Sequence, residues 1–350
     1  MTPACDPLGP SLQQVSAALR AADSVAALAA TAPGIRHLAH ELFASGVGAR
    51  RLTQLISRLN DVLSVHLVQM VAAEERLDLQ RACWLAFGSQ GRSEQTLATD
   101  QDNGLLFESD DPQRDRPRWM HLGRRVSEGL DACGYPLCKG NVMASNPDCC
   151  LTGAEWCDRF SAWMERGAPE DLLQASIYFD IRGLAGRLEL VQPLRELLTQ
   201  KATKLPRFTK QVADNALRER ASLNWRGAIA THKVDGHAMF DLKLRGTAIF
   251  VDAARLFSLS LGLPATGTRE RFEAAAAALK TPPHESDAWV TAFEFLQSLR
   301  LRVQFEHDDA PDNPNLIDVD SLNDFDRKVL LEALRVGRRL QQRMELDYQR

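Results

Sequence analysis

Two aspartates separated by one residue, Asp100 and Asp102, are the first feature of this 350-residue chain that could do chemistry. Side chains alternate along a β-strand, so two carboxylates at positions i and i+2 point to the same face. Like charges held so close together repel each other unless a cation lies between them. A hard divalent ion such as Mg²⁺ prefers oxygen ligands and commonly carries the phosphates of a substrate. The pair therefore predicts a metal site that also meets phosphate.

A Gly-Ser turn, Gly88-Ser89, stands ten residues before this pair and follows an apolar run at residues 83–87. The run has the length of a strand, and the turn is expected to open a short helix. Free backbone N–H groups at the start of a helix are a site for an anion. A phosphate-binding turn beside metal-binding carboxylates indicates phosphoryl or nucleotidyl transfer.

A third acidic group is needed near the first two, because in nucleotidyl transfer two metal ions hold the attacking and the leaving oxygen. Asp180 is the candidate, since it lies among apolar residues in a segment, residues 176–182, that is expected to form a strand. A carboxylate in such surroundings is costly to bury unless it has a partner or a metal. The alternative is that Asp180 caps a helix or forms an ion pair with Arg182.

Composition and charge exclude several classes of protein. Hydrophobic residues make up 45% and charged residues 25% of the chain, as in ordinary globular proteins. The formal net charge of −4 gives no overall positive field for a nucleic acid or an anionic membrane. No apolar run approaches the roughly 20 residues of a membrane helix, and residues 1–10, expected to be a disordered leader, lack the pattern of a signal peptide. The seven cysteines are an odd number without zinc-site spacing, which favours reduced thiols and a cytoplasmic location.

The periodicity of apolar residues divides the chain into three parts. Residues 1–79 are expected to be a helical segment, residues 80–200 an α/β domain and residues 201–350 a separate helical domain. The predicted strands are at residues 83–87, 103–108, 141–144 and 176–182. The predicted helices are at residues 11–32, near Leu38, from Leu52 to Leu67, and at residues 115–132, 152–165, 187–203, 207–232, 246–262, 268–279, 286–305 and 321–348. The acidic stretch from Asp308 to Asp312 is expected to be a solvated turn.

Motifs along most of the chain after about residue 50 resemble one family of proteins. Gly-Ser, ten residues, Asp-x-Asp and a later aspartate form the signature of the polymerase-β-like nucleotidyltransferase superfamily. More closely, residues 88–94 (Gly-Ser-Gln-Gly-Arg-Ser-Glu) and 99–103 (Thr-Asp-Gln-Asp-Asn) resemble a family of bacterial nucleotidyltransferases. That family is related to the protein-PII uridylyltransferase and the glutamine synthetase adenylyltransferase. Further likeness lies at residues 134–144, 179–182 and 240–255.

The resemblance implies an α+β fold, in which a small mixed-sheet nucleotidyltransferase domain is flanked by an N-terminal helical segment and a C-terminal, substrate-binding helical bundle. Members of the family often carry a cyclic-nucleotide-binding domain and paired CBS domains before the transferase. Only about 80 residues precede it here, so a sensor protein acting in trans is expected instead.

The resemblance also implies roles for individual acidic and turn residues. Gly88 and Ser89 would hold the β- and γ-phosphates of a nucleoside triphosphate. Asp100 and Asp102 would bind Mg²⁺ or Mn²⁺, and Asp180 would complete the metal site and orient the acceptor.

Basic residues are the remaining candidates for nucleotide binding. Arg92 and Arg182 are expected to bind phosphate, because a guanidinium matches phosphate oxygens as a fork. Glu94 is expected to orient Arg92. Lys243 and Arg255 are candidates to face the active cleft. The basic residues between 201 and 233 are interpreted as a solvated helix face, and RNA binding as the alternative.

The predicted activity is transfer of a nucleoside monophosphate from ATP or UTP to an acceptor hydroxyl, with release of pyrophosphate. The acceptor could be a regulatory protein, which would place the chain in signal transduction. Two alternatives stay open: a nucleotidyltransferase for a small molecule or RNA, and a nucleotide-binding signalling module without enzymatic activity.

Overall fold

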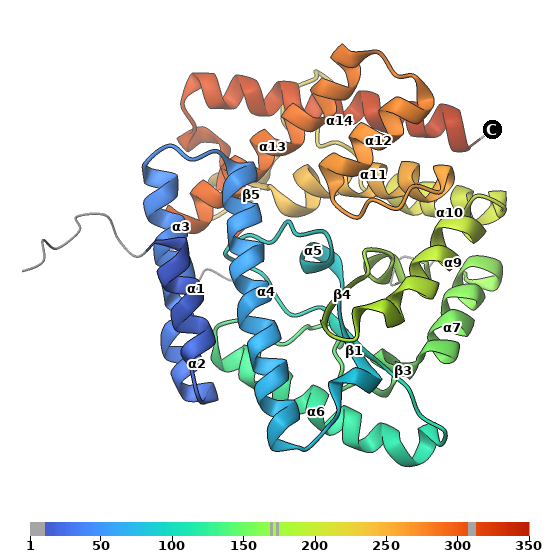
Figure 1. Ribbon diagram of the computed structural model, residues 1–350. Coiled ribbons are helices and arrows are strands. Elements are labelled where there is room, and N and C mark those ends of the chain that lie inside the picture. The colour runs from blue at the N-terminus through green and yellow to red at the C-terminus, as the bar shows by residue number, and fades with distance from the viewer. Residues whose placement is uncertain (1–10, 169–170, 173–174, 307–312, 350) are drawn as a thin grey trace, which may run out of the picture. The chain divides into compact units, whose positions relative to one another are not determined.

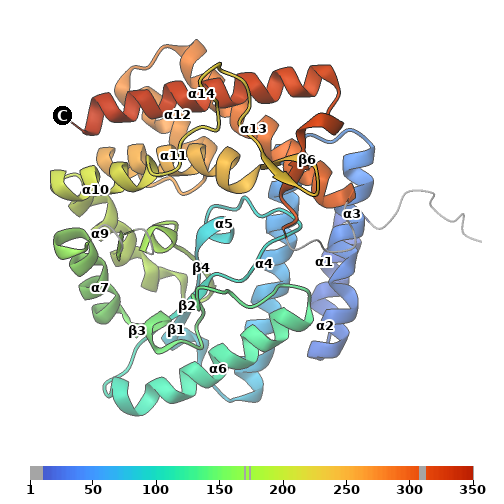
Figure 2. The ribbon, with the colours of Figure 1, turned by 180° about the vertical axis from the view of Figure 1, so that it is seen from behind.

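The computed structural model describes residues 11–168, 171–172, 175–306 and 313–349 (Figures 1 and 2). The chain divides into two compact units. Unit 1 comprises residues 1–156 and 181–193, and unit 2 comprises residues 157–180 and 194–350. The predicted leader, at residues 1–10, and the predicted acidic turn from Asp308 to Asp312 lie outside the described residues. The predicted domain boundaries near residues 80 and 201 stay predictions.

A four-stranded mixed sheet, with strand order β3-β2-β1-β4, forms the centre of unit 1. β1 (Ala82–Ala86) pairs antiparallel with β2 (Asn103–Phe107) on one side and with β4 (Arg182–Gly186) on the other. β3 (Cys150–Thr152) runs parallel to β2. Every residue of β1 and β2 is buried, which explains the continuous apolar run of β1 and the apolar residues 105–107 of β2.

Helices flank this sheet, as Figure 1 shows for α4 (Ala49–Glu74) and α6 (Pro112–Ala132). Leu59, Leu63 and Leu67 of α4 are buried and pack in one core with Trp84 and Phe107 of the sheet. α1 (Leu12–Ala21) and α3 (Pro33–Ala44) pack against α4. The small mixed sheet with helical flanks confirms the predicted α+β class.

The N-terminal helices differ from the prediction of one helix at residues 11–32. The chain leaves α1 at Ala21 and starts again as α2 (Val25–Thr31). The break occurs because the Ser24 side chain accepts a hydrogen bond from the N–H of Ala27 and so caps a new helix. Pro33, the residue after the predicted helix, is the first residue of α3, where a missing N–H has no cost.

Two predicted strands are wrong. Residues 141–144 are irregular, with Asn141 at a φ of 56°, and the strand beside β2 is instead β3. Residues 176–179 form a 3₁₀ helix, and the strand begins two residues after Asp180, at Arg182. Both segments are short and apolar, and periodicity alone does not separate such strands from turns or short helices.

Helices make up most of unit 2, and α11 (Ala248–Leu261) lies at its core. Its Phe257 contacts Phe272 of α12 (Thr268–Leu279) and Trp289 of α13 (Pro283–Glu306). α11 also packs against α10 (Pro206–Ala216) and α14 (Asp324–Tyr348). α7 (Gly153–Arg166) and α9 (Gln192–Ala202) are further long helices, and most of each belongs to unit 2.

A second, three-stranded antiparallel sheet lies where a helix over residues 207–232 was predicted to end. It contains β5 (His232–Val234), β6 (His237–Asp241) and β7 (Leu316–Asp318), in that order. The predicted helix stops at Ala216. Asp235 and Gly236 both have positive φ values, 49° and 89°, so this Asp-Gly pair forms the two-residue hairpin turn between β5 and β6.

No helix among the described residues combines the length and the apolar character needed to cross a membrane.

Candidate metal and nucleotide site

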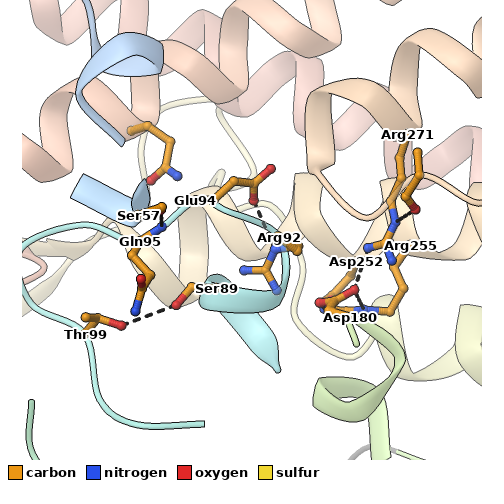
Figure 3. A network of polar contacts seen from close by, with 12 residues as sticks. Ser57, Ser89, Arg92, Glu94, Gln95, Thr99, Asp180, Asp252, Arg255 and Arg271 are labelled. Carbon is orange, nitrogen blue, oxygen red and sulfur yellow. Dashed lines mark hydrogen bonds and ion pairs between the residues drawn. The ribbon is translucent and has the colours of Figure 1, made fainter. Parts of the chain in front are cut away.

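The Gly-Ser turn lies directly after β1, as the short helix α5 (Gly88–Gly91). Gly88 has a φ of 53°, a left-handed conformation that favours glycine over residues with a Cβ atom. The Ser89 hydroxyl lies 3.3 Å from the Thr99 hydroxyl, and Figure 3 shows the two side chains pointing toward each other. The turn therefore faces the segment that carries Asp100 and Asp102.

The two carboxylates lie just before β2 rather than on a strand. The backbone oxygen of Asp102 accepts a hydrogen bond from the N–H of Phe87 at 2.9 Å, which fixes Asp102 beside the end of β1. Ligand atoms of Asp100, Asp102 and Cys138 all lie within 4.8 Å of one another. Two carboxylate groups at this spacing are the donor chemistry of a divalent cation, so the residues fit the metal that the sequence predicts.

Cys138 is the member of this cluster that sequence reasoning missed. Its thiol donates a hydrogen bond to Oδ1 of Asp102 at 3.3 Å. Burial and the charge of Asp102 raise the pKa of the thiol to about 11. The sequence signal for it is the turn sequence Lys139-Gly140-Asn141, which folds the chain back immediately after the cysteine.

Arg92 and Glu94 form an ion pair after the turn. Nε of Arg92 donates to Oε2 of Glu94 at 3.0 Å, the contact by which Glu94 was expected to orient Arg92 (Figure 3). The next residue, Gln95, is held to α4 because its N–H donates to the Ser57 hydroxyl at 2.9 Å. The segment from the turn to Asp100 is thus anchored on α4.

Arg182 is hydrogen-bonded to the helix that begins at the Gly-Ser turn. Its Nη2 donates to the backbone oxygen of Gln90 at 2.8 Å and to Oδ1 of Asp61 at 2.9 Å. The guanidinium therefore joins α4 to α5. The alternative prediction of an ion pair between Arg182 and Asp180 is wrong, because Asp61 is the partner.

Asp180 belongs to unit 2, where it is completely buried. Oδ1 accepts hydrogen bonds from Nη1 of Arg271 at 2.5 Å and from Nε of Arg255 at 3.2 Å, and Oδ2 accepts one from Nη2 of Arg255 at 2.7 Å (Figure 3). In this conformation both carboxylate oxygens serve an ion pair. The role of Asp180 in the metal site stays a prediction.

Arg255 does not face a cleft, contrary to expectation. Its side chain is buried, and it binds Asp252 at 2.6 Å in addition to Asp180. Burial alone would lower the pKa of this guanidinium, but the negative charges of Asp180 and Asp252 raise the pKa above its ordinary value. Arg255 is a structural cation of unit 2.

Lys243 is exposed at the start of a π-helical turn, Lys243–Thr247, in unit 2. The turn begins there because Oδ1 of Asp241 accepts hydrogen bonds from the N–H groups of Lys243 and Leu244, both at 2.8 Å. Contact of Lys243 with a nucleotide stays a prediction.

Two family models match the chain. One is described as "Putative nucleotidyltransferase DUF294" and matches residues 34–170, and the other, "Putative nucleotidyltransferase substrate binding domain", matches residues 206–348. The first match includes Gly88, Asp102 and Cys138 but ends before Asp180. No curated protein matches the chain. The two models succeed one another along most of the sequence, and the chain therefore belongs to this family of putative nucleotidyltransferases.

Proposed function

We propose that the protein transfers a nucleoside monophosphate from ATP or UTP to an acceptor hydroxyl and releases pyrophosphate, with Mg²⁺ or Mn²⁺ as the cation. The observation that carries the proposal is the close approach of Asp100 and Asp102, beside the Ser89 turn, inside the part of the chain that matches the nucleotidyltransferase model. Carboxylates at this spacing suit a divalent cation, and a nucleoside triphosphate is the common phosphate ligand of such a cation.

Gly88 and Ser89 bind the β- and γ-phosphates in this proposal, and Asp100 and Asp102 hold the cation against them. The cation supplies positive charge to the triphosphate oxygens. The acceptor hydroxyl loses its proton to solvent, its oxygen forms a bond to the α-phosphorus, the bond from that phosphorus to the bridging oxygen breaks, and pyrophosphate leaves. Most of the rate enhancement comes from alignment of the acceptor with the triphosphate and from neutralisation of the phosphate charge.

Arg92 and Arg182 have different roles in the proposed site. Arg92, oriented by Glu94, is a phosphate ligand. Arg182 acts through α5, because its guanidinium already holds the backbone oxygen of Gln90 and the carboxylate of Asp61. It keeps the Gly-Ser turn in position for the triphosphate.

Asp180 and Lys243 complete the site in the proposal. The register of the sheet supports Asp180, because Ala86 of β1 is paired with Asn103 on one side and with Arg182 on the other. The first residues of β2 and β4 thus share one end of the sheet. For Asp180 to bind a cation, it has to exchange one of its two arginines.

The acceptor is proposed to be a hydroxyl bound by the region of residues 206–348, which matches a substrate-binding domain. We favour a regulatory protein as the acceptor. The protein would then act in signal transduction, together with a separate sensor protein. Nucleic acid is disfavoured because the formal net charge is −4.

The test is transfer of label from α-³²P ATP or UTP into host lysate, followed by separation of protein, RNA and metabolite fractions. Asp102→Asn and Asp100→Asn are expected to lower labelling and pyrophosphate release by about 10²-fold or more, since each loses a metal-binding charge. Asp110→Asn, which alters an exposed acid after β2, is the matched control and keeps full activity.

Unchanged label transfer in both variants would reject the assignment. Label in RNA or in metabolites would keep the catalytic site and replace the acceptor. Nucleotide binding without any pyrophosphate release would identify a signalling module rather than an enzyme.

A further inference from the structure

Residues 136–142 form a loop that lies along the metal-binding segment, within unit 1. The N–H of Gln101 donates to the backbone oxygen of Pro136 at 3.1 Å, and the N–H of Asn103 donates to that of Val142 at 3.0 Å. These two bonds flank Asp102 in the sequence. Both ends of the loop are therefore tied to the backbone on either side of one metal-binding carboxylate.

Side chains of the metal-binding segment strengthen this attachment. Nε2 of Gln101 donates to the backbone oxygen of Tyr135 at 2.8 Å, and Oδ1 of Asn103 accepts from the N–H of Ala144 at 2.8 Å. Gln101 and Asn103 are buried, so their hydrogen bonds are shielded from water. The loop has little freedom to slide along the Asp100–Asn103 segment.

The loop turns tightly at its tip, where it presents Cys138. The N–H of Asn141 donates to the backbone oxygen of Cys138 at 2.9 Å, and Asn141 has a φ of 56°, which asparagine tolerates better than most residues. The thiol lies 3.3 Å from Oδ1 of Asp102 and within 4.8 Å of a carboxylate oxygen of Asp100. Cys138 is partly exposed, whereas Cys83, Cys133, Cys149 and Cys150 are buried.

We propose that Cys138 is a third protein ligand when Asp100 and Asp102 hold a thiophilic divalent cation. The inference rests on the proposed metal site and adds a sulfur donor to it. When a divalent cation binds, the S–H bond breaks, the sulfur bonds to the cation and the proton goes to solvent. Sulfur favours Zn²⁺, Co²⁺ and Cd²⁺, whereas Mg²⁺ requires oxygen ligands. The thiol therefore lets the site take a thiophilic divalent cation in addition to the Mg²⁺ or Mn²⁺ that its two carboxylates suit.

The test uses Cd²⁺ as the probe, added to the full chain, with the ultraviolet charge-transfer absorbance of a thiolate–cadmium bond as the readout. The wild-type protein is expected to gain this band with one equivalent of Cd²⁺. Cys138→Ser is expected to lose the band and to bind Cd²⁺ at least about 10-fold more weakly in calorimetry. Cys157→Ser, which alters another partly exposed thiol, is the matched control and keeps both properties.

A band that persists in Cys138→Ser, or wild-type binding of Cd²⁺ without a band, would overturn the proposal. If Cys138→Ser does not fold, alkylation of the wild-type protein replaces it. Mass spectrometry is expected to show that Cd²⁺ protects Cys138 but not Cys157 from iodoacetamide, and equal alkylation with and without Cd²⁺ would overturn the proposal.

The failure of this inference is distinct from the failure of the proposed function. A thiolate–cadmium band in a protein that transfers no nucleotide with any divalent cation leaves the ligand assignment standing and rejects the function. Nucleotidyl transfer that depends on Asp102, in a protein without the band, supports the proposed function and rejects Cys138 as a ligand.

Discussion

Gly88 sets the geometry of the candidate site at the scale of a single residue. β1 ends at Ala86, and the chain then reverses into α5 through the positive φ of Gly88. This reversal places Ser89 opposite Thr99, close to the two aspartates. A residue with a Cβ atom at position 88 would have to hold a left-handed backbone or move the turn.

We expect Gly88→Ala to lower the free energy of unfolding by about 1–2 kcal/mol, because an L-residue is strained in the left-handed region. Nucleotide binding should weaken as well, since relief of the strain shifts Ser89. Urea unfolding and calorimetry with a triphosphate measure the two effects. Gly153→Ala is the control, because a Cβ atom there would meet open space. Equal stability of Gly88→Ala and the wild type would show that the positive φ carries no cost.

At the scale of an element, the short segment that ends at Asp180 positions a charged side chain in the core of unit 2. The 3₁₀ helix Ser176–Phe179 delivers a buried carboxylate to arginines of two helices, Arg255 on α11 and Arg271 on α12. A buried carboxylate between two arginines is compensated, but removing its charge leaves two buried cations without a partner.

We expect Asp180→Asn to lower the free energy of unfolding of unit 2 by about 3–5 kcal/mol, because it breaks a buried ion pair. Asp252→Asn is the matched variant, since Asp252 binds the same Arg255 but its side chain is 37% exposed. Its cost should stay below about 1 kcal/mol. Urea unfolding of both variants gives the comparison.

Equal stability of the two variants would contradict the ion-pair role of Asp180. If Asp180→Asn were also to abolish label transfer while it stayed folded, the result would favour its predicted role at the metal instead. Stability and catalysis therefore separate the two roles of one residue.

Buried thiols link the stability of the whole protein to pH. Burial raises the pKa of Cys83 to about 12, and likewise that of Cys150 to about 12. An unfolded thiol has a pKa of about 8.5, so above that pH the unfolded chain loses protons that the folded chain keeps. The stabilising contribution is complete below pH ~8.5 and is lost as the pH rises toward about 12.

We expect Cys83→Ala to reduce the alkaline loss of stability by up to ~1.4 kcal/mol per pH unit above pH ~8.5, the contribution of one proton. The measurement is the free energy of unfolding in urea between pH 8 and pH 10, for variant and wild type. Cys157→Ala, which removes a partly exposed thiol, should change the slope less. Parallel pH profiles for the wild type and Cys83→Ala would exclude burial of this thiol as a cause.

The sequence and its family resemblance predicted the α+β class, which the structure confirms, and they predicted the residues of the candidate donor site. β1 is a continuous apolar run, and β2 ends in one, because both faces of these strands are buried. The candidate donor site was predictable because the Gly-Ser turn and Asp-x-Asp lie close together in the sequence. The buried face of α4 was also predictable, because its leucines recur with the period of an α-helix.

Only the tertiary structure decided which distant residues meet. Arg182 binds Asp61, which lies 121 positions away, and Asp180 binds Arg255 and Arg271, which lie 75 and 91 positions away. Cys138 meets Asp102 because backbone hydrogen bonds tie one loop to another. Periodicity and local motifs record burial and turns, but an ion pair or a hydrogen bond between remote segments depends on how the chain packs, and no local pattern encodes it.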